Sequence, residues 1–392
     1  MKRLLKISLD TLISSFSSIL IWFILSIFVD KNLITIFVLT YPIQYIASSL
    51  KAIFATGANI SHEKGNINDV LSGLTSGIIA SIIVTIIIIF NLKTYTSFMG
   101  INIDNEFVIY SVIQIFMQAI LNFVLIKLYY ENKNTLANIY STIFYLINLL
   151  SIFILSLSFK NVNFIIIPTL IFLGIFLIYI IVKSYKKFIF KFNLLKWIKY
   201  SSVDLSNNIF LGLGFLFGLN IAINFGKEYV LAMNFVALIT DTQWDITDAI
   251  ETVAKIDISR NKFNYKEHFK NAYKLVYILI ASIITMFIIF NNFYDLNLMI
   301  VIIYLLFHVA DLLMCPIFKI DTIYLQLEYS TIKTTSINLS SRFLRMLISF
   351  LKTPYCNVIA QVSTSAYLTI IVNALLKKHF IISKEGKISR LK

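Results

Sequence analysis

Apolar runs long enough to cross a lipid bilayer recur along this chain from one end to the other. A helix of about 20 apolar residues spans the hydrocarbon core of a membrane. Only 14% of the residues are charged and 58% are hydrophobic, too little charged surface for a soluble protein of 392 residues. The runs predict an all-α integral membrane protein with twelve transmembrane helices, at 7–29, 33–56, 70–90, 106–128, 136–158, 162–182, 203–225, 229–254, 272–290, 296–318, 329–350 and 354–376.

The placement of the basic residues indicates the topology. A net charge of +14 would point to nucleic acid in a soluble protein. With the N-terminus inside, however, inner segments hold most of the 34 lysines and arginines, as the positive-inside rule requires. We therefore expect a plasma-membrane protein with both termini in the cytoplasm, a basic face against membrane lipids and no nucleic-acid partner. Outer segments hold five lysines: Lys31, Lys93, Lys160, Lys227 and Lys352.

The twelve predicted spans divide into two halves of six. The polar string Ile60–Asn66 resembles Ile258–Asn264, and each string lies between the second and third spans of its half. Because six is even, both halves run in the same direction, which predicts two six-helix bundles related by a parallel pseudo-two-fold repeat. The expected parts are an N-terminal lobe at 1–190, a basic connector at 191–202, a C-terminal lobe at 203–376 and a basic cytoplasmic tail at 377–392.

Four acids mark the predicted eighth span. At about 100° per residue, Asp241, Asp245 and Asp248 share one helix face, and Glu251 lies at its edge. A charged side chain at the centre of a span costs about 2.5–3.5 kcal/mol. We therefore expect this face to line a polar cavity that binds a cation or a cationic substrate. The structural alternative is that these acids pair with buried bases or line the cytoplasmic mouth.

Neighbouring polar residues extend this predicted site. Gln243 and Trp244 lie among the four acids, and a Trp ring can stack on a flat or quaternary cation, although Trp near an interface commonly acts as an anchor. In the predicted tenth span, His308 lies one turn before Asp311. This pair could relay protons or hold a cation, or the two side chains could simply satisfy each other.

Two of the five arginines, Arg342 and Arg345, lie three residues apart in the predicted eleventh span. Arginine makes forked contacts with carboxylates and phosphates. The pair is therefore either an anion clamp or a structural partner of acids in the same half. No ATP-binding motif and no metal-type spacing occurs. We expect no enzyme activity, no metal site, and energy from an ion gradient.

Several short stretches resemble the multidrug and toxic-compound extrusion (MATE) transporters. Phe225–Asn234 is similar to the family's Gly-x-x-x-x-x-Ala segment that opens the eighth helix. Glu131–Thr135 with the later Asn148 resembles the polar turn and Asn of the fourth and fifth helices, and Leu327–Thr331 with Arg342 resembles the eleventh.

The resemblance implies two six-helix lobes that export cationic, amphipathic compounds in exchange for Na⁺ or H⁺ through a cleft. Members often carry an acid inside the first helix, whereas this chain has Trp22 there and only Asp10 at the end of that helix. The other common placement uses the seventh and tenth helices; Asp311 fits the tenth, and Asp204 lies only at the edge of the seventh. We therefore expect ion coupling in the second lobe.

We predict a monomeric secondary transporter for an amphipathic, cationic small molecule, with Na⁺ or H⁺ as coupling ion and no other cofactor. The same superfamily contains lipid-linked-glycan flippases. The alternative is therefore a flippase for a phosphate-bearing lipid-linked glycan, gripped by Arg342 and Arg345. A third hypothesis, a membrane scaffold or polytopic enzyme subunit, predicts no dependence on the buried charges.

Overall fold

The computed structural model describes residues 17, 20–21, 23–29, 40–63, 66, 68–98, 105–131, 133–184, 189, 193–259, 262–291 and 296–391. Contacts divide the chain into two compact units. We call Ser17–Asn224 the N-unit and the part that begins at Phe225 the C-unit. The predicted lobe boundaries stay a prediction.

Eight described helices are long and apolar enough to cross a membrane: Asp69–Phe90, Val108–Leu128, Thr135–Ser158, Val162–Ser184, Asp204–Phe225, Tyr265–Phe290, Leu298–Glu328 and Cys356–His379. They overlap eight of the predicted spans, so the chain is a multi-pass membrane protein with a largely helical fold. The count of twelve and the internal repeat stay predictions.

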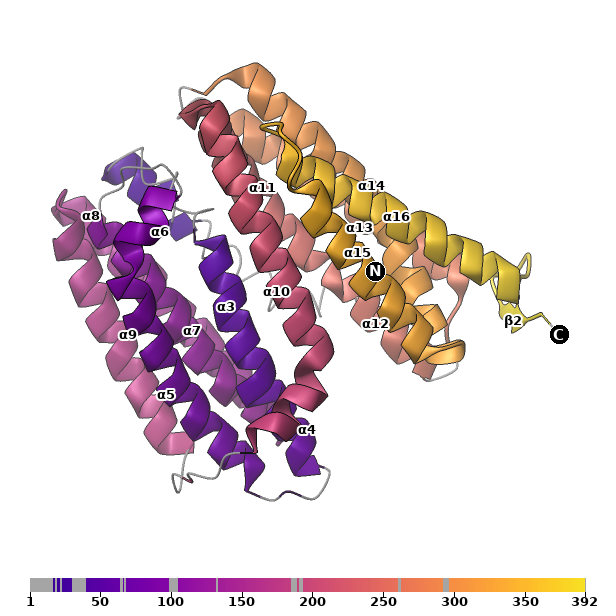
Figure 1. Ribbon diagram of the computed structural model, residues 1–392, viewed down its shortest axis with the longest axis horizontal. Helices are drawn as coiled ribbons and strands as arrows, with labels where there is room; N and C mark the ends of the chain where they lie inside the picture. The colour runs from indigo at the N-terminus through magenta and orange to yellow at the C-terminus, as the bar shows by residue number, and fades with distance from the viewer. Residues whose placement is uncertain are drawn as a thin grey trace. The chain divides into compact units, whose positions relative to one another are not determined.

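The N-unit is a helical bundle built around α7, which packs against α3, α5, α8 and α9 (Figure 1). An added Cβ at Gly73 of α5 would lie 2.3 Å from the Cβ of Ala58, so glycine is what allows α4 and α5 to approach. The elements are α3 (Tyr41–Lys51), the π-helix η2 (Ala52–Gly57), α4 (Ala58–Glu63), α5 (Asp69–Phe90), α6 (Leu92–Phe98), α7 (Asn105–Tyr130), α8 (Asn134–Ser158), α9 (Val162–Ser184) and α10 (Leu194–Phe225).

A buried carboxylate joins α4, α5 and α10 within this unit. Asp69 is 1% exposed and begins α5. It accepts hydrogen bonds from Ser61 Oγ at 2.6 Å, Asn193 Nδ2 at 2.8 Å and Trp197 Nε1 at 3.0 Å. Because each oxygen has a partner, the buried charge is compensated and holds the start of α10 against the α4–α5 turn.

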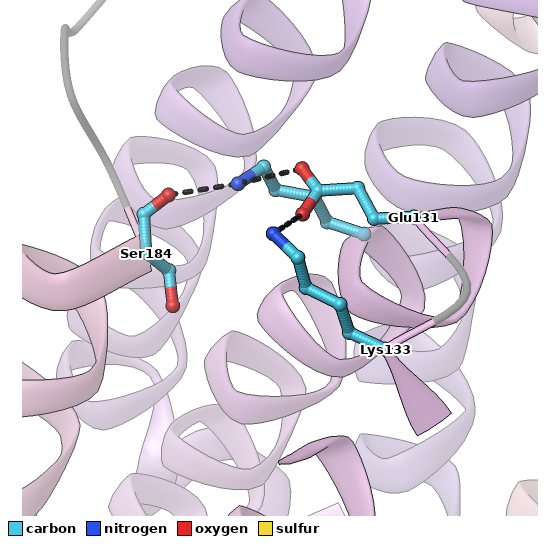
Figure 2. A network of polar contacts seen from close by, with 4 residues as sticks. Glu131, Lys133 and Ser184 are labelled. Atoms are coloured by element: carbon cyan, nitrogen blue, oxygen red, sulfur yellow. Dashed lines mark hydrogen bonds and ion pairs between the residues drawn. The ribbon is translucent and has the colours of Figure 1, made fainter. Parts of the chain in front are cut away.

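A second polar network fixes the ends of α7 and α9. Glu131 forms ion pairs with Lys127 at 3.1 Å and with Lys133 at 2.7 Å, and Lys127 Nζ also donates to the carbonyl oxygen of Ser184 at 2.7 Å. Figure 2 shows Glu131, Lys133 and Ser184 converging at this point. The last turn of α9 is thereby tied to the end of α7.

The C-unit is organised around α14, which packs against α11, α12, α13, α15 and α16. Its apolar core includes Val276, Leu312 and Leu376, from α13, α14 and α16. The elements are α11 (Lys227–Ile246), α12 (Asp248–Ser259), α13 (Tyr265–Phe290), α14 (Leu298–Glu328), α15 (Thr331–Ile348), α16 (Cys356–His379), β1 (Phe380–Ile382) and β2 (Ile388–Arg390).

Local capping explains where three of these helices begin. Side-chain oxygens of Asn264, Asn297 and Ser330 accept hydrogen bonds from backbone N–H groups in the first turns of α13, α14 and α15. Such caps satisfy donors that have no partner within the helix, and they explain why Asn and Ser occupy these positions.

The predicted eighth span is not one uninterrupted helix. Helix α11 ends at Ile246, Thr247 forms a turn, and α12 begins at Asp248. The Thr247 hydroxyl donates to the carbonyl oxygen of Trp244 at 2.6 Å, a local bond that competes with helix continuation. The single-helix geometry assumed for 229–254 therefore holds only as far as Ile246.

The predicted basic tail contains a small β-hairpin in which Phe380 pairs with Arg390. Gly386 lies in its turn with φ +83°, a conformation that favours glycine. The hairpin contacts the start of α13: Asn264 Nδ2 donates to the carbonyl of Glu385 at 2.9 Å, and Tyr265 N–H donates to that of Gly386 at 2.9 Å. This part of the tail is thus a component of the C-unit.

Candidate functional site

The candidate site is centred on α14, the helix that contacts every other helix of the C-unit. Asn297 caps its first turn, and Pro316 lies inside it, five residues after Asp311. Proline has no N–H, so the helix lacks the usual hydrogen bond to the carbonyl of Leu312. The helix is therefore weakened one turn beyond the acid, in a segment of membrane-spanning composition.

Asp311 is completely buried within the C-unit. Its Oδ2 accepts a hydrogen bond from Gln361 Nε2 of α16 at 2.5 Å. Ser365, one turn further along α16, is a second hydrogen-bonding neighbour of the carboxyl group. Oδ1 has no hydrogen-bond partner among the residues that the structure describes. The carboxyl group is thus positioned on one side and unsatisfied on the other.

An unsatisfied carboxylate oxygen is energetically costly at full burial. An unpartnered buried polar atom costs about 1–3 kcal/mol, and more when it is charged. The cost disappears if Oδ1 binds a proton, or if a cation approaches it. The chemistry that this geometry favours is therefore reversible binding of H⁺ or a small cation. Gln361 and Ser365 would supply neighbouring oxygens.

Basic side chains surround this acid. Arg345 of α15 is a charged neighbour of both His308 and Asp311, and Arg342 is a neighbour of Asp311. The structure thus places His308, Asp311 and the two arginines in one electrostatic environment. The sequence predicted the His308/Asp311 pair and the arginine pair separately, and their common location is a result of how α14 packs against α15.

The predicted roles of Gln243 and Trp244 look different in the structure. Gln243 is 3% exposed, and its Nε2 donates to Ser282 Oγ of α13 at 3.3 Å. The Trp244 ring lies 5.3 Å from Lys319 Nζ, a cation of the protein itself. Both side chains therefore have partners within the C-unit that account for their positions without a ligand.

The acids of the predicted eighth span are only partly within the structure's reach. The backbone of Asp241 and Asp245 belongs to α11 and that of Asp248 begins α12, but the side chains of all three lie outside the described residues. Glu251 lies in α12 and is half-buried, and it has at least one interaction partner. Their predicted cation-binding role stays a prediction.

Sequence reasoning missed Asp321, a second fully buried acid of α14. Tyr265 Oη donates to its Oδ1 at 2.9 Å, and Asn373 Nδ2 donates to its Oδ2 at 3.0 Å. Because both oxygens have partners, Asp321 ties α13, α14 and α16 together rather than offering a free ligand atom. Its signal in the sequence was an acid ten residues beyond Asp311, in a stretch assigned to the inner loop.

No family model matches this sequence, and a search of curated proteins likewise finds no match. Solved structures do match. An inward-facing multidrug resistance MATE family transporter of the MOP superfamily aligns with a TM-score of 0.64 at 13% identity, over 96% of this chain and 95% of that one. The chain has the MATE transporter fold. An outward-facing structure with the same family description aligns with a TM-score of 0.60 at 15% identity, over 96% of both chains.

The third comparison concerns pocket chemistry. A MOP superfamily transporter from Pyrococcus furiosus, described as having a binding pocket of reversed polarity that suggests a different function, aligns with a TM-score of 0.62. Its identity is 14%, over 95% of each chain. The resemblance to the MATE family seen in the sequence is thus confirmed at the level of the fold, over nearly the whole chain. The matched proteins are transporters and not enzymes.

Proposed function

We propose that this MATE-fold protein is a secondary active transporter that exports an amphipathic, cationic small molecule by alternating access, driven by Na⁺ or H⁺. The observation that carries the proposal is Asp311, a fully buried acid of α14 with one oxygen left without a partner. We further place the protein in the plasma membrane as a monomer, with both termini in the cytoplasm, from the distribution of its basic residues.

Coupling requires a group whose ion-bound and ion-free forms stabilise different conformations of the protein. In the ion-free form, Asp311 carries an uncompensated charge inside the C-unit, and rearrangement that hydrates it is favoured. In the ion-bound form, the charge is neutralised and close packing of α14 against α16 is favoured. Pro316 lies at a point where α14 can bend between the two forms.

The alternative acids of the described N-unit fit this role less well. Asp69 has all its hydrogen bonds, Glu131 is ion-paired, and Asp204 is exposed. This supports coupling in the second half of the chain, as the sequence predicted. Asp241 and Asp245 remain proposed additional cation ligands on the strength of the sequence alone.

The test is dye efflux from vesicles that contain the purified protein, under separately imposed Na⁺ and proton gradients. Asp311→Asn cannot ionise but nearly preserves the shape of the side chain. We expect it to abolish gradient-driven efflux while insertion and monodispersity stay normal. Asp204→Asn, which changes an exposed acid, is the matched control and should transport normally. Unchanged efflux by Asp311→Asn under both gradients would reject the proposal.

A flippase for a phosphate-bearing lipid-linked glycan is the second candidate, and Arg342 and Arg345 beside Asp311 are the observation in its favour. Two arginines suit a phosphate better than they suit a cation. Efflux that survives Asp311→Asn but fails in Arg342→Gln and Arg345→Gln, together with transfer of a labelled anionic lipid between leaflets, would favour this function.

A further inference from the structure

An apolar groove of about 800 Å³ lies between α8 and α9 of the N-unit. Leu150 and Ile154 of α8 and Phe172, Ile175 and Tyr179 of α9 are among its lining residues. These five side chains are 49–62% exposed. Both helices are long and apolar enough to cross a membrane, so this groove opens where acyl chains lie.

The dimensions of the groove fit one acyl chain. Its α8 side runs from Ile147 to Leu155, about 12 Å at 1.5 Å per residue. That length is close to the ~15 Å depth of one hydrocarbon leaflet. A helix of a partner protein is about 10 Å across with its side chains, and would need a wider trough than one formed between two adjacent helices.

A basic group stands at one end of the groove. Lys183 is exposed one turn beyond Tyr179, and its Nζ donates to Tyr179 Oη at 2.8 Å. Lys127 and Lys133 nearby are both paired with Glu131. Among the described residues, by contrast, no carboxylate forms an ion pair with Lys183, so its charge is available to a ligand outside the protein.

The position of this charge is fixed by the network of Figure 2. The carbonyl of Ser184 accepts a hydrogen bond from Lys127, which holds the last turn of α9 in place. A Tyr and a Lys at the end of a membrane span mark the level of the lipid headgroups. The groove and the charge are therefore arranged like the two parts of a phospholipid, with the apolar part inside the bilayer and the basic part at its surface.

We propose that the α8–α9 groove is a binding site for an anionic phospholipid, with one acyl chain in the groove and the phosphate group against Lys183. Tyr179 contributes its ring to the groove and its hydroxyl to the lysine, so it joins the two parts of the site. A basic residue near the membrane surface attracts anionic headgroups, which is why we assign an anionic lipid rather than a neutral one. The site is independent of the proposed transport function.

Native mass spectrometry of the full-length protein, extracted from vesicles of equal phosphatidylglycerol and phosphatidylcholine, tests the charged part. We expect the protein to retain phosphatidylglycerol several-fold more than phosphatidylcholine. Lys183→Gln should remove this preference. Lys160→Gln is the matched control, because Lys160 is an exposed lysine just before the opposite end of α9. Equal retention of the two lipids by the wild type, or an unchanged preference in Lys183→Gln, would overturn the proposal.

A second pair of variants tests the groove. Ile175 lines it, whereas Ile178 of the same helix does not, and the two are 62% and 63% exposed. Ile175→Trp fills the groove and should reduce lipid retention several-fold, whereas Ile178→Trp should not. Excess glycerol phosphate should not displace the lipid. Displacement by it would indicate a site for free phosphate, and dimers without bound lipid would indicate an interface between two copies; either result contradicts the proposal.

Discussion

Gln361 of α16 donates a hydrogen bond to Oδ2 of Asp311 on α14, and leaves Oδ1 of the same carboxyl group without a partner among the described residues. The two residues lie 50 positions apart in the sequence. This contact orients the one described carboxylate that is both fully buried and incompletely satisfied. The predictions below test this contact and the tertiary contacts that hold the two units together internally.

Gln361→Leu removes the donor and keeps the approximate volume of the side chain. Because it leaves a buried carboxylate without its partner, we expect a loss of about 1–3 kcal/mol in the free energy of unfolding, seen as a lower unfolding temperature in detergent. Thr364→Val is the control, since that hydroxyl bonds only to Ala360 of its own helix. In an Asp311→Asn background the cost of Gln361→Leu should be smaller. An equal cost in both backgrounds would contradict the contact.

Asp69→Asn should destabilise the N-unit. The change replaces one carboxylate oxygen with an amide N–H₂ group, which then faces a donor from Ser61, Asn193 or Trp197. We expect a loss of about 2–4 kcal/mol, because hydrogen bonds to charged groups contribute about 1.5–3 kcal/mol. The exposed Asp204→Asn is the control and should change stability by less than about 0.5 kcal/mol. Equal unfolding temperatures for the two variants would refute this assignment.

Gly386→Ala should detach the C-terminal hairpin from the C-unit. The new Cβ would lie 2.3 Å from Asn264 Oδ1, and the backbone φ of +83° is strained for alanine. We expect faster hydrogen exchange in residues 380–390, measured by mass spectrometry. Gly174→Ala is the control: its nearest contact is 3.5 Å, and alanine inside α9 should be neutral or stabilise by up to ~1 kcal/mol. Unchanged exchange in Gly386→Ala would show that the hairpin does not depend on this approach.

The network at Glu131 should respond to acid. Partial burial raises the pKa of Glu131, but the hydrogen bonds and charges of Lys133 and Lys127 outweigh it and hold this pKa below its ordinary value. A carboxyl group whose pKa is lowered by folding binds fewer protons in the folded state. Its contribution is therefore present above the unfolded pKa of about 4.3 and is lost as the pH falls through the folded-state pKa.

Glu131→Gln tests this dependence. We expect the difference in unfolding temperature between wild type and variant to stay constant from pH 7 to about 5.5 and to shrink below about pH 4. Because the Glu131 side chain is 35% exposed, the contribution should not exceed about 1 kcal/mol. A difference that grows on acidification would contradict the direction of the shift.

The location of the membrane helices could be predicted because hydropathy depends only on neighbouring residues. The eight helices of Figure 1 that satisfy the length and composition criteria coincide with predicted spans. Asp311 and His308 were also visible as candidates, since a charged or titratable residue inside an apolar run is rare enough to be noticed. The MATE-like stretches pointed to the correct fold for a similar reason, because they are local strings.

Other features were not predictable from such patterns. The turn at Thr247 depends on a hydroxyl group competing for a backbone carbonyl, and hydropathy does not register it. Trp244 was predicted to stack on a ligand cation, but the cation beside it is Lys319, 75 positions later in the chain. The same holds for Gln243, whose donor group is used by Ser282 of α13.

By itself, the sequence determined that this chain is a bundle of membrane helices and which apolar runs contain polar groups. Only the tertiary structure decided which of those groups are satisfied. Asp311 and Asp321 are both acids of α14 and both fully buried, yet one has an unpartnered oxygen and the other has none. The reason is physical: whether a buried acid is compensated depends on donors such as Gln361, Tyr265 and Asn373, which reach it only when α13 and α16 pack against α14.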